Sequence, residues 1–287
     1  MRVGRWIMCA ALGLPIPGCQ VPGRRSEVEP VREEPGLLWV FPGVEGGEHS
    51  VARACRAFRD AGVTADIEIH DWDRPFGLLV NLMSYERNRR DAAGVAERIA
   101  AYRAQHPAAP IDLVGYSGGG GVALMVTEAL PDDVHVRHVL MVQPAVSPDY
   151  DLSTALAHID GKLVLFYCPS DWLILGWGTR LFGTMDRRKV ASAGKTGFDL
   201  PKAAPDPTQR AHLEQVCWTA DMRATGHRGK HRNILGYRWN KAYVAPYLTP
   251  RADQSGNPAD SSTMQSPPPV TSANHRASKC PPGSAGI

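Results

Sequence analysis

Short apolar runs alternate along the chain with segments whose apolar residues recur at helical spacing. Residues 37–41 form a continuous apolar run closed by Pro42-Gly43, which is typical of a strand buried on both faces of a parallel sheet. Ser50 then suits the start of a helix, whose apolar residues recur until Gly62 ends it.

The same patterns predict the remaining elements. Further strands are expected at residues 65–70, 111–114, 136–142, 163–167 and 215–218, and further helices at 91–106, 121–130 and 238–247. Strands that alternate with helices indicate the α/β class, with a mostly parallel central sheet flanked by helices.

The composition supports one large folded domain. The chain has 287 residues, of which 43% are hydrophobic, so it can bury a core and wholesale disorder is excluded. The formal net charge is only +3 and the basic residues are scattered, so no nucleic-acid partner is expected. No apolar run approaches the roughly 20 residues that cross a bilayer, which excludes a polytopic membrane protein.

Residues 1–19 have the pattern of an export signal. Arg2 and Arg5 precede an apolar run at residues 6–14. The stretch Ile16-Pro17-Gly18-Cys19 also resembles the signal of a bacterial lipoprotein, in which Cys19 would be lipidated and would attach the chain to a membrane. The alternative is an ordinary N-terminus with a chance cysteine. The pattern predicts an exported protein of the cell envelope, either membrane-anchored or periplasmic.

Composition also divides the rest of the chain. Residues 20–35 are rich in Arg, Glu and Pro and are interpreted as a linker. Residues 36–250 are expected to form the folded domain. Residues 251–287 are rich in Pro, Ser and Gly, and we expect them to be a disordered tail.

The cysteines and carboxylates predict no metal site. The six cysteines include no C-x-x-C pair, so Cys55, Cys168 and Cys217 are interpreted as buried apolar thiols. An export signal would permit a disulfide bond, whose partners stay open. Asp71-Trp72-Asp73 brings two carboxylates to a strand end, but no histidine beyond His70 stands at metal spacing, and such carboxylates more often face solvent.

The strongest chemical signal is Gly115-x-Ser117-x-Gly119, between a predicted strand and a predicted helix. Small flanking residues let strand and helix approach closely, so the serine occupies a sharp, strained turn with its hydroxyl above the sheet. The turn also directs the Gly118 N–H, at the helix start, to where an oxyanion can form. The alternative is a nucleotide-binding turn, but that motif, G-x-G-x-x-G, follows the first strand, and this turn follows at least two.

With this motif the chain, from residue 36 to about 249, resembles the α/β-hydrolase superfamily. The resemblance implies an α/β-hydrolase fold and a triad in the chain order nucleophile, acid, histidine. Ser117 matches the nucleophile. Asp171, which follows the predicted strand 163–167, matches the acid that orients the imidazole. The alternative for Asp171 is a turn residue that caps a helix.

The resemblance places the histidine in the loop after the last strand, where residues 226–231 (GHRGKH) contain two candidates. We favour His231 as the base, with His227 as the alternative; the other histidine would support the triad from behind or lie at the rim of the site. The second oxyanion donor is expected after the first strand, where the Val44 N–H matches best. This loop has Pro-Gly where the family more often has His-Gly.

The same resemblance bears on access to the site. Only 20 residues separate the predicted strands 136–142 and 163–167, where many relatives insert a cap, so no large cap domain is expected. The segment 172–211, which begins with an apolar cluster, is either a lid over Ser117 or a helix packed on the sheet, and both interpretations stay open.

These residues predict a serine hydrolase that cleaves a carboxylic ester or related acyl bond through an acyl-enzyme, with no metal or organic cofactor. The expected partner is a small-molecule or lipid acyl ester, and thioesterase, lipase and peptidase activities stay open. The alternative is a catalytically inactive protein of this fold that acts as a binding or scaffold protein of the cell envelope.

Overall fold

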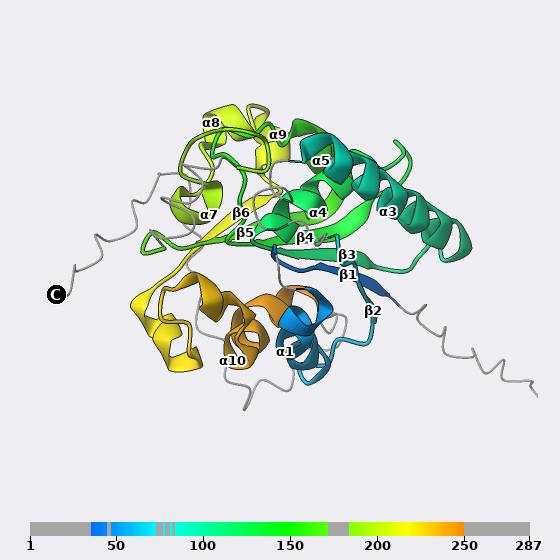
Figure 1. Ribbon diagram of the computed structural model, residues 1–287. Coiled ribbons are helices and arrows are strands. Elements are labelled where there is room, and N and C mark those ends of the chain that lie inside the picture. Colours follow the sequence, from blue (N-terminus) through cyan, green and yellow to red (C-terminus); the bar gives the residue numbers. More distant parts are fainter. Residues whose placement is uncertain are drawn as a thin grey trace, which may run out of the picture. The chain divides into compact units, whose positions relative to one another are not determined.

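A six-stranded sheet forms the centre of the domain, and every neighbouring pair of its strands is parallel (Figure 1). The spatial order is β2-β1-β3-β4-β5-β6. The strands are β1 (Leu37–Phe41), β2 (Asp66–Ile69), β3 (Ile111–Tyr116), β4 (Val136–Val142), β5 (Ile159–Tyr167) and β6 (Leu213–Cys217). Because the strands are parallel, their carboxyl ends lie along one edge of the sheet, where the loops that follow them can meet.

The computed structural model describes residues 36–44, 47–72, 84–171 and 184–249, together with Gly77 and Asn81. All of them belong to one compact unit that begins at residue 34. The predicted export signal, linker and C-terminal tail lie outside the described residues, as do residues 172–183 of the candidate lid. Within the described ranges, none of the helices has the length and apolar character needed to cross a membrane.

Helices cover both faces of the sheet (Figure 1). One face carries α3 (Tyr85–Gln105), α4 (Gly118–Glu128) and α5 (Ser153–Ala157), and the other carries α1 (Gly47–Arg59) and α10 (Tyr237–Trp239). The remaining short helices are α7 (Ala193–Thr196), α8 (Leu200–Ala203), α9 (Pro207–Arg210), η2 (Ala220–Thr225), η3 (His231–Leu235), η4 (Asn240–Val244) and η5 (Ala245–Tyr247). Between β4 and β5 the helix α5 is only 5 residues long, so no cap domain is inserted there.

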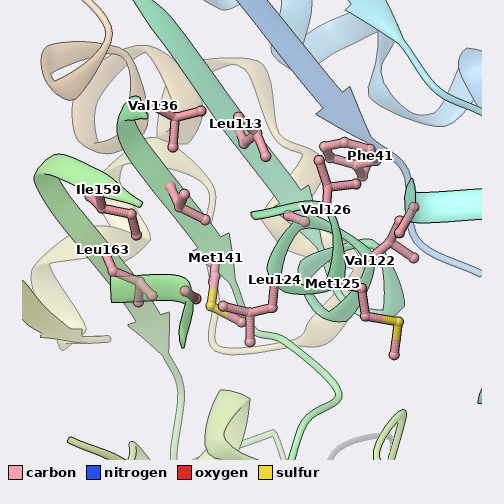
Figure 2. Packing of buried hydrophobic residues seen from close by; sticks show 14 of the residues in the cluster. Phe41, Leu113, Val122, Leu124, Met125, Val126, Val136, Met141, Ile159 and Leu163 are labelled. Carbon is pink, nitrogen blue, oxygen red and sulfur yellow. The ribbon is translucent and has the colours of Figure 1, made fainter. Parts of the chain in front are cut away.

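Residues of β1 alternate between two layers of the core. Leu37, Trp39 and Phe41 belong to the cluster that includes α3 and α4, whereas Leu38 and Val40 belong to the cluster that includes α1 and α10. All of them are buried, which explains why this strand reads as a continuous apolar run. Figure 2 shows the first cluster, in which side chains of α4 pack against those of β1, β3, β4 and β5.

The predicted fold class is confirmed, and the differences concern element boundaries. The helix α3 begins at Tyr85 rather than residue 91, and β5 begins at Ile159 rather than residue 163. The predicted helix 238–247 is present as a short α-helical turn followed by the π-helical turn η4 and the 3-10 turn η5. Pro246 has no N–H to donate, so a regular α-helical hydrogen-bond ladder cannot pass through it.

The cysteines divide into free and bonded ones. Cys55 and Cys168 are free, and burial raises the pKa of both thiols, that of Cys55 to about 11. The prediction of a free thiol at Cys217 is wrong, because this residue is disulfide-bonded. Cys217 is the last residue of the edge strand β6 and is only partly buried.

Candidate active site

Ser117 occupies a strained turn between β3 and α4. Its backbone has φ 54° and ψ −120°, a conformation that costs a non-glycine residue about 1–3 kcal/mol. Its N–H donates to the carbonyl of Val142 at 2.9 Å, and its carbonyl accepts from the N–H of Gly120 and of Ala145. The turn is therefore held by β4 as well as by the helix that it starts.

The two flanking glycines of the motif are sterically required. A Cβ atom at Gly115 would lie 2.4 Å from the carbonyl oxygen of Gly119, and one at Gly119 would lie 2.3 Å from the carbonyl oxygen of Phe41. Both obstacles are backbone atoms, which cannot rotate away. The first turn of α4 is thus pressed against the ends of β1 and β3, as the motif predicts.

His231 bridges Ser117 and Asp171. Its Nε2 lies 2.9 Å from Oγ of Ser117, and its Nδ1 lies 2.7 Å from Oδ2 of Asp171. The carboxylate is the natural acceptor for an Nδ1–H, which leaves Nε2 as the acceptor for the serine hydroxyl. The side chain of Asp171 is 4% exposed and that of His231 is 12% exposed, so their contact is largely shielded from water. Ser117 itself is partly exposed.

His227 is buried behind this site and has different partners. The N–H of Gly229 donates to its Nδ1 at 3.2 Å, and the side-chain amide of Gln143 lies 3.1 Å from its Nε2. Burial lowers the pKa of His227 to about 4, so the ring is neutral at pH 7. Of the two candidate histidines, the structure brings His231 to Ser117 and gives His227 a supporting position.

Side-chain donors bind the backbone carbonyls of the loop that carries the histidine. Ser170 Oγ donates to the carbonyl of Gly229 at 3.3 Å, and the thiol of Cys168 faces the same oxygen. The indole N–H of Trp218 donates to the carbonyl of His227 at 2.9 Å. These contacts hold the backbone at two of the four residues that precede His231.

The loop after β1 lies against the serine. A Cβ atom at Gly43 would be 3.4 Å from Cβ of Ser117, and one at Gly118 would be 2.7 Å from Cγ2 of Val44. As the first residue of α4, Gly118 has no acceptor for its N–H within the helix. The structure therefore brings together Gly118 and Val44, the two residues whose N–H groups were expected to hold an oxyanion.

Sequence reasoning missed two residues at this edge. Trp72, which was set aside with its flanking aspartates, is 2% exposed and its ring lies beside Gly118. Gln143 is the first residue after β4, has φ 46° and is buried against His227. Gln143 directly follows the predicted strand 136–142, and Trp72 stands two positions after the predicted strand 65–70. Polar or aromatic residues just beyond the carboxyl ends of parallel strands were the available signal.

Residues 184–211 of the candidate lid belong to the described part of the chain. In the described part of the segment 172–211, Met185, Ala193 and Phe198 are buried in the same cluster as α4, so this part packs on the domain. The described residues contain no group of three His, Cys, Asp or Glu side chains placed to hold a metal ion.

A strained serine at the end of an inner parallel strand, reached by a histidine and an acid from later loops, is the arrangement typical of the α/β-hydrolase fold, and this chain has that fold. No protein-family model matches the chain, and no curated protein matches it in sequence.

Several solved structures are similar to it. A cutinase-like protein from Cryptococcus sp. is 12% identical, with 75% of this chain and 95% of that chain covered and a TM-score of 0.40. An acetyl xylan esterase is 15% identical, with 75% and 100% covered and a TM-score of 0.39. A serine hydrolase without a lid from Xanthomonas campestris is 14% identical, with 76% and 82% covered and a TM-score of 0.38.

Proposed function

We propose that this protein is a serine hydrolase that cleaves a carboxylic ester or a related acyl bond. The observation that carries the proposal is the double contact of His231, whose two ring nitrogens face the hydroxyl of Ser117 and the carboxylate of Asp171. A neutral imidazole in this position can take the serine proton as the hydroxyl attacks, which is what a serine needs to become a nucleophile at neutral pH.

The proposed reaction has two halves. Ser117 Oγ attacks the acyl carbon while its proton passes to Nε2 of His231, and the oxyanion that forms accepts hydrogen bonds from the N–H groups of Gly118 and Val44. The intermediate collapses, the leaving alcohol takes the proton from His231, and the acyl group stays on Ser117. Water then attacks the acyl carbon of this ester while its proton passes to His231. His231 returns the proton to Ser117 Oγ as the acyl–Oγ bond breaks, and the carboxylic acid product is released. Asp171 holds the imidazole and stabilises its charged form.

The test is turnover of a series of chromogenic acyl esters by the folded protein, beside its Ser117→Ala variant. We expect activity in the wild type that is lost with the hydroxyl, and labelling of the wild type alone by a fluorophosphonate. The length of the best acyl chain would define the pocket. A wild type that is inert toward all the esters and is not labelled would contradict the proposal and favour a binding or scaffold role.

We also propose that the protein is exported to the cell envelope, with Cys19 as its lipid attachment site. The N-terminal pattern carries this proposal. The test is palmitate labelling and membrane fractionation of the full chain in a bacterial host. Label that persists in Cys19→Ser, or a chain that stays in the cytoplasm, would contradict it.

A further inference from the structure

We infer that Trp72 is a positioning residue for the oxyanion site, which it holds in place through the carbonyl of Pro42 and the surface of Gly118. This inference rests on the proposed function, because it assigns a role in the same reaction. It concerns a residue that lies outside the Ser117, His231 and Asp171 chain of contacts and does not itself donate to the oxyanion.

The first contact is a hydrogen bond to the loop after β1. The indole Nε1–H of Trp72 donates to the carbonyl oxygen of Pro42 at 2.9 Å, in a fully buried setting. That carbonyl belongs to the peptide unit that leads into Gly43, and Val44 follows. Fixing the plane of one peptide in so short a segment constrains the direction of the next N–H groups, and the Val44 N–H is the expected donor.

The second contact is with the other expected donor. A Cβ atom at Gly118 would lie 3.1 Å from Cη2 and Cζ2 of Trp72, and 2.7 Å from Cγ2 of Val44. The edge of the indole and the methyl group of Val44 therefore both rest against the first residue of α4. Trp72 thus contacts the loop of one donor and the residue that supplies the other.

The two residues before Trp72 lie beside the start of α1 and beside β1. Asp71 Oδ2 would lie 3.4 Å from a Cβ at Gly47, which has φ 52° and begins α1. The N–H of His70 donates to the carbonyl of Val40 at 3.0 Å and so continues the pairing of β2 with β1. The three consecutive residues that follow β2 thus make contact with β1, with the loop after it and with the start of α1.

Such support has a physical purpose here. Donors to an oxyanion accelerate the reaction only when they already point to the place where charge develops, and each well-placed donor contributes roughly 10²–10³-fold. The glycine of a Pro-Gly segment is conformationally permissive, so the segment by itself does not fix the direction of the N–H groups that follow it. A buried indole that donates to the Pro42 carbonyl supplies that direction from outside the loop.

Trp72 also belongs to the core cluster that contains α4, so the test must separate its positioning role from a role in packing alone. Trp39 is the matched control: it is in the same cluster, it is 1% exposed, and its Nε1 has no hydrogen-bond partner among the described residues. Trp72→Phe and Trp39→Phe both shrink a buried ring, but only the first removes a donated hydrogen bond.

The experiment compares the two variants with the wild type on the best ester found. We expect Trp72→Phe to lower kcat about 10-fold with KM within about twofold and an unchanged pH profile. We expect Trp39→Phe to lose a similar amount of thermal stability with kcat within about twofold. A trifluoromethyl ketone, which forms an anionic adduct with the serine, should bind Trp72→Phe more weakly by the same factor as kcat/KM falls.

Equal kcat values in the two variants would overturn the inference while leaving the proposed function intact, since the wild type would still turn over the ester. If Trp72→Phe fails to fold, replacement of Trp72 by benzothienylalanine keeps the ring shape and removes only the N–H. The same drop in kcat is then expected, and a kcat equal to that of the wild type would overturn the inference.

Discussion

Nε2 of His231 lies 2.9 Å from Oγ of Ser117 although 114 positions separate the two residues in the chain. The contact exists because both residues follow strands of one parallel sheet, Ser117 directly after β3 and His231 in the loop beyond β6. β4 and β5 lie between these strands, and the loop after β5 supplies Asp171 on the same edge. The sheet order thus converts distant sequence positions into one chain of hydrogen bonds.

The first prediction separates the two histidines of the loop. His231→Ala should lower kcat by about 10⁴-fold or more, because the serine loses its base. His227→Asn should retain activity within about tenfold, since His227 contacts Gln143 and Gly229 rather than the serine. Steady-state kinetics on one ester measures both. The reverse order of effects would make His227 the base.

The second prediction concerns Asp171. Asp171→Asn should lower kcat by about 10³–10⁴-fold, because an amide does not hold the imidazole in the tautomer that leaves Nε2 free to accept the serine proton. Circular dichroism and thermal unfolding of the same sample check that the domain stays folded. If Asp171 only capped a turn, kcat would stay within a few-fold of the wild type, and that result would reject its assignment as the acid.

A third prediction follows from the lowered pKa of His227. The unfolded chain takes up a proton on this residue near its ordinary pKa of 6.5, whereas the folded protein does so only near pH 4, because the ring is buried. Between these values the unfolded state binds more protons. The stability that the buried neutral ring contributes to the free energy of unfolding is therefore fully present above about pH 6.5 and is lost as the pH falls toward 4.

The size of this effect is up to about 3 kcal/mol in the free energy of unfolding. Urea unfolding at a series of pH values from 7 to 4 measures it, with His227→Asn as the control. The slope of stability against pH should be shallower in the variant. Parallel curves for the two proteins would show that another group is responsible for the acid sensitivity.

The fourth prediction tests the steric basis of the serine turn. Gly119→Ala should destabilise the domain by more than about 3 kcal/mol or prevent folding, because its Cβ would lie 2.3 Å from two backbone carbonyl oxygens, those of Phe41 and Pro42. Gly94→Ala is the matched control, since Gly94 lies within α3 and a Cβ there meets nothing within 4 Å. It should stabilise the domain by about 0.5–1 kcal/mol. Denaturant unfolding compares the two.

The sequence by itself determined the features that depend on local sterics. A glycine two positions before and after Ser117, between an apolar run and a helical pattern, predicted the strained turn, because only residues without a Cβ fit there. The continuous apolar run of β1 predicted a strand buried on both faces. These patterns depend only on residues that are close together in the sequence. The α/β class and the position of the turn could therefore be predicted without knowing which distant residues are in contact.

Only the tertiary structure decided what depends on contacts across the sheet. His227 and His231 stand in one short loop, and which of them faces Ser117 follows from how that loop is held against Ser170 and Gln143. The burial of Trp72 against Pro42 and Gly118 could not be predicted from two flanking carboxylates that suggested an exposed strand end. In each case the deciding partner is distant in sequence, and only the order of the strands brings the two together.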